Sequence, residues 1–408
     1  MNHDFKNRVV ITGIGIIASN GKGKTEFFNN CYNGRSGLKK CTLFETSNFN
    51  TQIAGEINEI KYPYESENPY EKSRIEYLIE DCIEELLADS RLNATKISAL
   101  KERACLSFAT SLGTNCNLLQ YEKEINQGKD AKREWMISIA KLVPGIKEIL
   151  GIEGGCFTTT TACAASTTGI GIGYDLIKFG KADLVIVGGA DPLNEFSYYG
   201  FNALHALSKS ICKPFDRERD GINIGEGCGF ITLESIESAK RRNAKIYGEI
   251  FGYGINNDAY HITSPDPEGR GAYLSMKMAC EQGENNLESI NYINAHGTGT
   301  KLNDSMELKA IQKLFGNCKE EVLVSSIKPL VGHCLAAAGI IEFILTILSI
   351  ENVLCVGNVN LQNVINENGC KNVVLLKSNK KKKITKALTN NFAFAGNTAS
   401  ILLGKFKE

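Results

Sequence analysis

Three residues have the side chains and the sequence context that covalent chemistry needs: Cys163, His296 and His333. Cys163 lies in TTTTACAASTTGIGIG, residues 158–173, where a stretch of small residues predicts the start of a helix. Free backbone N–H groups and the macrodipole at a helix start favour an anion, so we expect the pKa of this thiol to fall from about 8.5 towards or below neutrality. His296 in NAHGTGT and His333 in KPLVGHCLAAAG each follow a predicted strand, where α/β sheets place functional groups. These residues suggest a reactive thiolate and two candidate catalytic histidines, although one more buried thiol and two ordinary core or surface histidines are the alternative.

The elements that must position these residues alternate between strand and helix along the whole chain. Helical stretches separate short β-branched runs that predict strands, namely RVVITGIGII, ADLVIVGGA, CGFITLES, INYINAHG, VLVSSI and ASILLG. This alternation predicts an α/β fold with largely buried sheets.

A weak duplication divides the chain into two halves, residues 1–250 and 251–408. Cys163 precedes AASTTGIGIGYDLIKFG in the first half, and His333 precedes CLAAAGIIEFILTILSI in the second. Helices with Ala and Gly near their starts can pack backbone to backbone, so we expect both N-termini to meet at one place. Two unrelated buried helices are the alternative.

Composition limits the classes of function. The 408 residues contain 46 Lys plus Arg and 46 Asp plus Glu, which predicts no strong attraction to nucleic acid or to an anionic membrane. The fourteen cysteines include no CxxC pair, and residues 1–10 carry no apolar signal region, so we expect reduced thiols, no structural zinc and a cytoplasmic location. No apolar run reaches the roughly 18 residues that a membrane helix needs.

Two nucleotide-binding patterns are incomplete. GIGIIA, residues 13–18, fits a dinucleotide fingerprint, but NNCYNGRSGLKK stands where an acidic residue should follow, so close packing of glycines explains it better. ASNGKGKT has Ala18 where a phosphate-binding loop needs glycine.

Six motifs occur in one order: TACAAS, KPFDRERDGINIGEGCGFITLE, DAYHITSPDPEGRGA, NAHGTGTKLND, SSIKPLVGHCLAAAG and NNFAFAG. Together they closely resemble the elongating β-ketoacyl-acyl-carrier-protein synthases of fatty-acid synthesis and the ketosynthases of type II polyketide and polyene pathways. The resemblance covers the whole chain. It implies a thiolase-type fold, a five-layered αβαβα body built from two similar halves, and usually a homodimer.

The resemblance also implies a reaction that needs no cofactor of the enzyme's own. Cys163 would take an acyl group from the phosphopantetheine of an acyl carrier protein, and a decarboxylated malonyl thioester would then extend it by two carbons. His296 and His333 would stabilise the enolate, and the backbone amides of Cys163 and Phe394 would hold the oxyanion.

Further residues match the family's site by position. Lys328 and Glu307 would pair behind the histidines for orientation and charge balance, although a buried structural ion pair is the alternative. Thr298 and Thr300 would bind the pantetheine arm, and Phe392 and Phe394 lie on the loop that gates acyl access. We expect no metal, although Asn294 and Glu342 match a position where some members hold a structural monovalent cation.

The chain departs from the family in ways that suggest two hypotheses. The gating loop reads FAFAGN, with Ala393 and Ala395 at positions that are usually glycine, so we expect it to move less freely. DGINIGEGCG and DPEGRGA look more like polyene ketosynthases, which suggests an unsaturated or otherwise specialised acyl chain.

Competing functions remain open. A non-catalytic, chain-length-factor-like subunit of a heterodimer shares the fold but usually lacks the cysteine. A thiolase would carry a second cysteine near NNFAFAG, a starter condensing enzyme would have asparagine in place of His333, and an oxidoreductase would rest on GIGIIA alone.

Overall fold

The computed structural model describes residues 7–58, 72–113, 122, 124–128, 139–283, 286–365 and 370–408. Its strands form two groups. The first runs in the order β6-β5-β7-β8-β1 and pairs parallel and antiparallel neighbours, with bounds β1 (Val9–Ala18), β5 (Ala104–Ala109), β6 (Cys156–Thr159), β7 (Leu184–Asp191) and β8 (Gly227–Ser235).

The second group runs in the order β9-β16-β15-β10-β11-β13. Its bounds are β9 (Gly248–Asn257), β10 (Ile290–Asn294), β11 (Val322–Ser325), β13 (Val373–Leu375), β15 (Lys386–Phe392) and β16 (Asn397–Gly404). Short pairs lie beside the main strands: β2 (Gly21–Lys22) on β1, β3 (Lys39–Lys40) with β4 (Ile53–Ala54), and β12 (Leu354–Cys355) with β14 (Lys380–Lys381).

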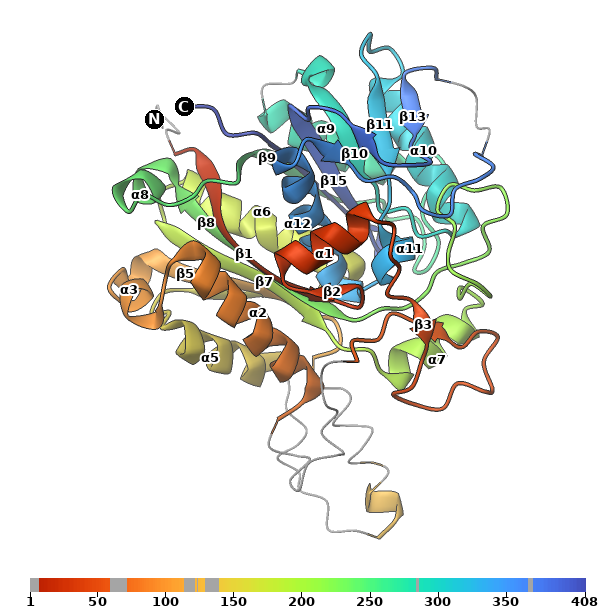
Figure 1. Ribbon diagram of the computed structural model, residues 1–408, viewed down its shortest axis with the longest axis horizontal. Coiled ribbons are helices and arrows are strands. Elements are labelled where there is room, and N and C mark those ends of the chain that lie inside the picture. The colour runs from red at the N-terminus through yellow and green to blue at the C-terminus, as the bar shows by residue number, and fades with distance from the viewer. Residues whose placement is uncertain are drawn as a thin grey trace.

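The two groups join where the first residues of β1 pair with β9, in the register Val9↔Ile250, Val10↔Glu249 and Ile11↔Gly248. This junction makes one continuous hydrogen-bonded sheet. The two groups of strands lie over each other, and helices pack between them (Figure 1).

Helices cover both outer faces. On the first group lie α2 (Arg74–Ser90) and α5 (Ile139–Leu150), and on the second lie α9 (Arg270–Gln282) and α10 (Lys301–Phe315) (Figure 1). Gly15 of β1 permits the close approach of α2, because a Cβ there would lie 2.0 Å from the carbonyl oxygen of Cys82. Smaller helices are α1 (Lys24–Tyr32), α3 (Ala94–Ser98), α7 (Glu195–Ala203), α8 (Ile236–Arg241) and α11 (Lys328–Val331).

Two helices form the middle layer: α6 (Ala165–Lys178) and α12 (Ala338–Glu351). Both contact strands of both groups, so the layers run helix, strand, helix, strand, helix, and the predicted five-layered αβαβα fold is confirmed. The helices meet near their first turns, where Ile340 N donates to Ser166 Oγ at 2.9 Å and a Cβ on Gly339 would lie 2.1 Å from Thr167 Oγ1. The predicted meeting of the two N-termini is therefore confirmed as well.

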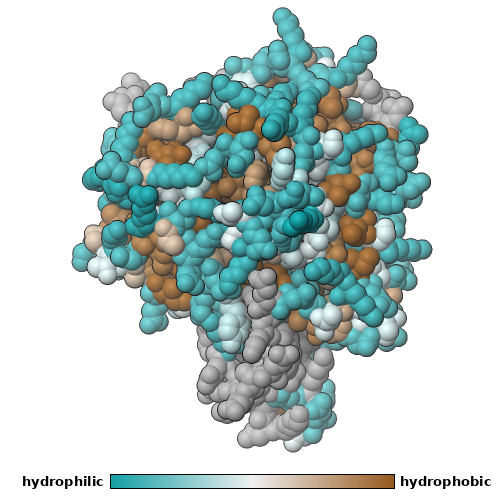
Figure 2. Space-filling model, in the orientation of Figure 1, coloured by the Kyte–Doolittle hydropathy of each residue, from teal (hydrophilic) through white to brown (hydrophobic). Residues whose placement is uncertain are grey.

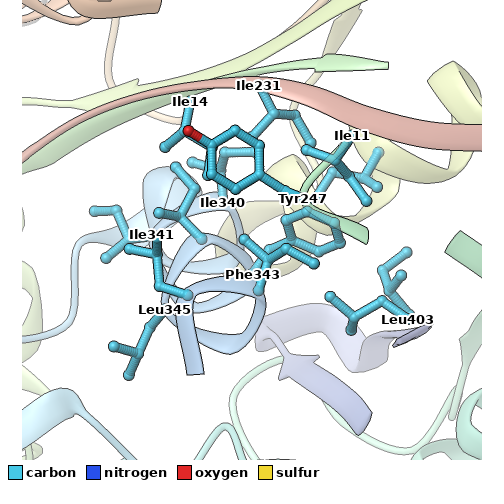
Figure 3. Close-up of a cluster of buried hydrophobic side chains, with 14 of the residues drawn as sticks. Ile11, Ile14, Ile231, Tyr247, Ile340, Ile341, Phe343, Leu345 and Leu403 are labelled. Carbon is cyan, nitrogen blue, oxygen red and sulfur yellow. The ribbon is translucent and has the colours of Figure 1, made fainter. Parts of the chain in front are cut away.

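The core centres on α12. Every residue of this helix from Ala338 to Ile350 is buried, and its apolar side chains pack against β1, β8 and β16 (Figure 3). No helix in the described part of the chain is long and apolar enough to cross a membrane. The face in Figure 2 is mainly hydrophilic, with hydrophobic side chains in small separate groups.

The six predicted strands are confirmed as β1, β7, β8, β10, β11 and β16, but β5, β6, β9, β13 and β15 of the main sheet were not predicted. β9 crosses residue 250, and the division into residues 1–250 and 251–408 stays a prediction. The thirteen cysteines that the structure describes are free thiols.

Candidate active site

Cys163 lies in the turn that leads into α6. This turn is a single 3₁₀ turn, η4 (Ala162–Ala164), and it begins with Ala162 in the left-handed region at φ 49°. The side chain is 7% exposed and lines a cavity of about 470 Å³. Burial raises the pKa of Cys163 to about 12, although the positive charge of Lys328 opposes the rise.

The sequence-based expectation of a lowered pKa at Cys163 was therefore wrong. A helix start favours the thiolate, but removing the thiolate from water disfavours it more strongly. The free thiol is accordingly mainly protonated near pH 7, and only its small thiolate fraction is reactive.

His333 lies two residues before the corresponding turn that leads into α12. The turn η6 (Leu335–Ala337) begins with Leu335 at φ 50°, as η4 begins with Ala162. The N–H of Leu335 donates to His333 Nδ1 at 3.1 Å, so the ring proton must be on Nε2. Burial and the charge of Lys328 lower the pKa of His333 well below its usual range. His333 is therefore a neutral Nε2–H donor.

His296 follows β10 and has the same protonation. Its Nδ1 lies 3.3 Å from Lys328 Nζ, and because an ammonium can only donate, Nδ1 accepts and Nε2 carries the proton. Burial, Lys328 and His333 together lower the pKa of His296 well below its usual range. The rings of His296 and His333 lie 5.2 Å apart between centroids at an angle of 83°. Two neutral imidazole donors thus stand side by side at the cavity that Cys163 lines.

Lys328 is the charged group behind the histidines. Its Nζ donates to Glu342 Oε1 at 2.6 Å and to the carbonyl oxygen of His296 at 2.5 Å. Asn391 Nδ2 donates to the other oxygen, Glu342 Oε2, at 2.6 Å. Lys328 and Glu342 are buried together, so each neutralises the other in a region without solvent.

The predicted pairing of Lys328 with Glu307 was wrong. Glu307 Oε1 accepts from the N–H of His296 at 2.9 Å, and Oε2 accepts from the N–H of Gly297 at 2.8 Å. Burial raises the pKa of Glu307 to about 7. Glu307 on α10 contacts the backbone of His296 and Gly297, whereas Glu342 on α12 contacts Lys328 Nζ. Glu307 thus holds the segment that bears His296.

The remaining predicted residues line the same cavity. Thr298 Oγ1 and Thr300 Oγ1 lie 2.9 Å apart, and Thr300 also caps α10 through the N–H of Asn303. Phe394 stacks on Phe201 with ring centroids 5.6 Å apart. These groups line the cavity together with Cys163, His296, His333 and Phe392.

The Phe394 loop continues the cavity wall and is held by the 257–262 segment. Ala395 has φ 59°, its N–H donates to Ile262 O at 2.7 Å, and its carbonyl accepts from Asn257 Nδ2 at 2.7 Å. Phe394 begins the 3₁₀ turn η7 (Phe394–Gly396), and like Cys163 in η4 it lines the cavity.

Sequence reasoning missed several residues of the site. Asp304 accepts from the N–H of Phe215 at 2.7 Å and of Gly299 at 3.2 Å, and so joins two of the six motifs. His205 and His261 line the cavity mouth. The small number of histidines was the available signal, since four of the five in the chain line this cavity.

At the candidate cation position the Glu342 carboxylate already has two partners, whereas Asn294 Oδ1 is buried without a hydrogen-bond partner among the described residues, and cation binding there stays a prediction. Within the described ranges, no cluster of three His, Cys, Asp or Glu side chains could hold a metal ion. The carboxylate of Glu342 is occupied by Lys328 and Asn391, and Asn294 Nδ2 donates to Glu342 O at 2.9 Å and Thr346 Oγ1 at 3.2 Å.

Comparisons with known proteins agree with this geometry. Residues 6–239 match the family model for the β-ketoacyl synthase N-terminal domain, and residues 247–362 match the one for the C-terminal domain. The chain belongs to the β-ketoacyl synthase family. 3-Oxoacyl-[acyl-carrier-protein] synthase 2 of Staphylococcus aureus (strain COL) is 32% identical, over 98% of this chain and 99% of the relative.

Solved β-ketoacyl synthases have the same fold. The ishigamide ketosynthase/chain length factor superposes with a TM-score of 0.90 at 29% identity, over 98% of this chain and 100% of that one. A type II PKS ketosynthase, solved with its acyl-carrier protein and bound to the hexaketide, superposes with a TM-score of 0.88 at 29% identity and the same coverage.

Proposed function

We propose that this β-ketoacyl synthase is a condensing acyltransferase that extends an acyl chain by two carbons. The observation that carries the proposal is the meeting of Cys163 with two neutral Nε2–H imidazoles, His296 and His333, at one cavity. A thiol can hold the acyl group as a thioester. Two neutral imidazoles can donate hydrogen bonds to the enolate oxygen without transferring a proton to it.

The first half of the reaction is acyl transfer. Cys163 Sγ attacks the carbonyl of an acyl thioester, the C–S bond to the carrier breaks, and the thiol proton passes to the departing phosphopantetheine sulfur. The N–H groups of Cys163 and Phe394 bind the oxyanion of the tetrahedral intermediate. The acyl group then remains on Cys163 as a thioester.

The second half is decarboxylative condensation. A malonyl thioester loses CO₂, and its thioester oxygen takes up the negative charge, which the Nε2–H groups of His296 and His333 stabilise. The enolate carbon attacks the acyl carbonyl on Cys163, and the collapse of that intermediate breaks its C–S bond. The products are a β-ketoacyl thioester and the Cys163 thiolate, which takes a proton from water to restore the thiol.

The substrates arrive on the phosphopantetheine of an acyl carrier protein, and the enzyme needs no cofactor of its own. The hydroxyls of Thr298 and Thr300 at the mouth suit the amides of a pantetheine arm. The likeness to a ketosynthase solved with its acyl-carrier protein supports this partner.

Assembly as a homodimer, or as a heterodimer with a related subunit, also belongs to this proposal, as does a cytoplasmic location. β6 lies at the end of the strand order with Phe157 37% exposed, and such an edge can pair with a second chain. A non-catalytic partner subunit is the alternative function; the complete set of Cys163, His296 and His333 opposes it.

The acyl chain itself belongs to either a fatty-acid or a polyketide and polyene pathway. The motifs DGINIGEGCG and DPEGRGA favour an unsaturated or otherwise specialised chain. Ready elongation of saturated acyl carriers, with polyenoyl carriers left unused, would contradict that preference.

Intact-mass detection of both half-reactions tests the proposal. The purified protein is mixed with malonyl-carrier and a panel of saturated and polyenoyl carriers, with Cys163→Ala as the control. We expect an acyl adduct on the wild type alone and then a product longer by two carbons. A folded wild type that forms no adduct with any chain would favour the partner-subunit function.

A further inference from the structure

Asp191 is a buried carboxylate that the reaction above does not use. It is the last residue of β7 and is fully buried. Oδ1 accepts from Thr110 Oγ1 at 2.7 Å and from the N–H groups of Ser111 and Leu112 at 2.9 Å each. Oδ2 accepts from the N–H of Ala336 at 2.8 Å. The side chain therefore joins the segment after β5 to the turn η6.

This carboxylate has no cationic partner in the part of the chain that the structure describes. Among the described residues, no Lys, Arg or His lies within 4 Å of it in an ion pair, so neutral donors alone balance its charge. A buried charge held in this way is costly unless its donors stay in place. The segments that supply the donors are consequently fixed by Asp191.

One of those segments orients His333. Leu335 is in the left-handed region, which a leucine adopts only under constraint. Its N–H binds His333 Nδ1, and the next N–H, that of Ala336, binds Asp191. The backbone of His333 is held separately, by Asn223 O and Gly225 N. The ring, in contrast, depends on the conformation of Leu335.

We infer that Asp191 is a positioning residue that keeps η6 in its strained conformation and thereby fixes His333 as the Nε2–H tautomer. Asp191 belongs to β7, and it acts on the distant His333 ring through the backbone of Leu335 and Ala336. The consequence for catalysis rests on the proposed function, whereas the effect on the ring does not.

The substitution Asp191→Asn removes both the negative charge and one acceptor oxygen. We expect these two changes to affect the two half-reactions differently. An amide has one oxygen, so its Nδ2 must face either the N–H of Ala336 or the donors of residues 110–112, donor against donor. We expect condensation to fall about 10- to 100-fold, because a donor displaced by about 1 Å loses that much. Acyl transfer is not expected to fall, because the charge of Asp191 raises the pKa of Cys163 and its removal has the opposite effect.

The experiment measures three quantities in wild type and Asp191→Asn. These are the rate of acyl adduct formation, the rate of condensation from the preformed adduct, and the ¹⁵N–¹H correlations of histidine-labelled protein, with His333→Gln for assignment. Glu234→Gln is the matched control, because Glu234 is equally buried and lies at the opposite end of the β7–β8 pair. We expect this control to keep the ratio of the two rates and the His333 signals.

The results discriminate clearly. A selective loss of condensation in Asp191→Asn, with a shift of the His333 signals away from the pure Nε2–H form, supports the inference. Unchanged His333 signals, or an equal loss in both half-reactions, overturns it. If the wild type forms no adduct, the proposed function fails, while the histidine spectra still test the link between Asp191 and His333.

A second variant covers the case in which Asp191→Asn does not fold. Thr110→Val removes one donor to Asp191 and keeps the size of the side chain. We expect the same selective loss, about 2- to 10-fold, as the loss of one hydrogen bond predicts. An unchanged ratio of the two rates overturns the inference.

Discussion

Lys328 Nζ lies 2.6 Å from Glu342 Oε1, and both side chains are almost completely buried. Lys328 is the first residue of α11, which precedes His333, and Glu342 lies in the second turn of α12. The pair fixes the amine beside His296, whose Nδ1 it contacts. The carboxylate that neutralises Lys328 is thus Glu342 on α12, the helix that follows His333 in the sequence. It is not Glu307 on α10, the helix that follows His296.

A double-mutant cycle tests this pairing. We expect Lys328→Met to lower the free energy of unfolding by about 3–5 kcal/mol, because it leaves Glu342 charged and buried. Combined with Glu342→Gln, it should show a coupling energy of about 1–3 kcal/mol by urea denaturation. The matched cycle with Glu307→Gln should give a smaller coupling. A larger coupling to Glu307 would contradict the assignment.

The pH dependence of alkylation tests the state of Cys163. Burial raises the pKa of Cys163 to about 12, and only the thiolate reacts, so the thiolate fraction should rise about tenfold per pH unit well below that pKa. We expect iodoacetamide labelling of the Cys163 peptide, followed by mass spectrometry, to increase steadily from pH 7 to pH 9. A plateau below pH 8 would show that the helix start outweighs burial.

Two arginines of different exposure test the value of a buried ion pair. Arg74 binds Glu226 with both side chains at 0% exposure, whereas Arg103 binds Asp183 with its side chain 47% exposed. We expect Arg74→Met to lower the free energy of unfolding by about 3–5 kcal/mol, because Glu226 is left buried. The control Arg103→Met should lower it by less than about 1 kcal/mol. Equal losses would contradict this difference.

The loop of residues 392–397 should respond differently to glycine at its two alanines. Ala393 is extended at φ −120°, and glycine there adds conformational freedom, so hydrogen exchange of residues 392–397 should become faster. Ala395 is left-handed at φ 59°, and glycine there removes strain of about 1 kcal/mol from the folded loop, so exchange should be slower than in Ala393→Gly. Equal acceleration in both variants would contradict the role of strain. Ala399→Gly in β16 serves as the control.

The pattern of residues predicted much of the fold. Runs such as RVVITGIGII and ADLVIVGGA are continuous and β-branched because these strands are buried on both faces, and they became β1 and β7. β9, GEIFGYGINN, was missed because its glycines weaken the strand signal and its burial alternates only in part.

The sequence motifs identified the reactive residues of the site, but not the contacts between distant segments that surround them. Cys163, His296 and His333 were found from their motifs and do share a cavity. The partner of Lys328 could not be found in this way, because Glu342 and Glu307 are both acidic residues on helices, and only the packing of α12 brings one of them to the amine. Similarly, the pKa of Cys163 depends on burial by distant segments, which the local sequence around residue 163 does not contain.

The position of α12 between the two groups of strands affects synthesis on the ribosome. Its apolar surface is covered on one side by β15 and β16, which are the last strands to be translated. While the chain is still growing, α12 is translated before β15 and β16, and the side of the helix that they cover lacks these partners until they follow. Slow translation of the final segment would prolong that exposure of apolar surface, which favours aggregation of the nascent chain.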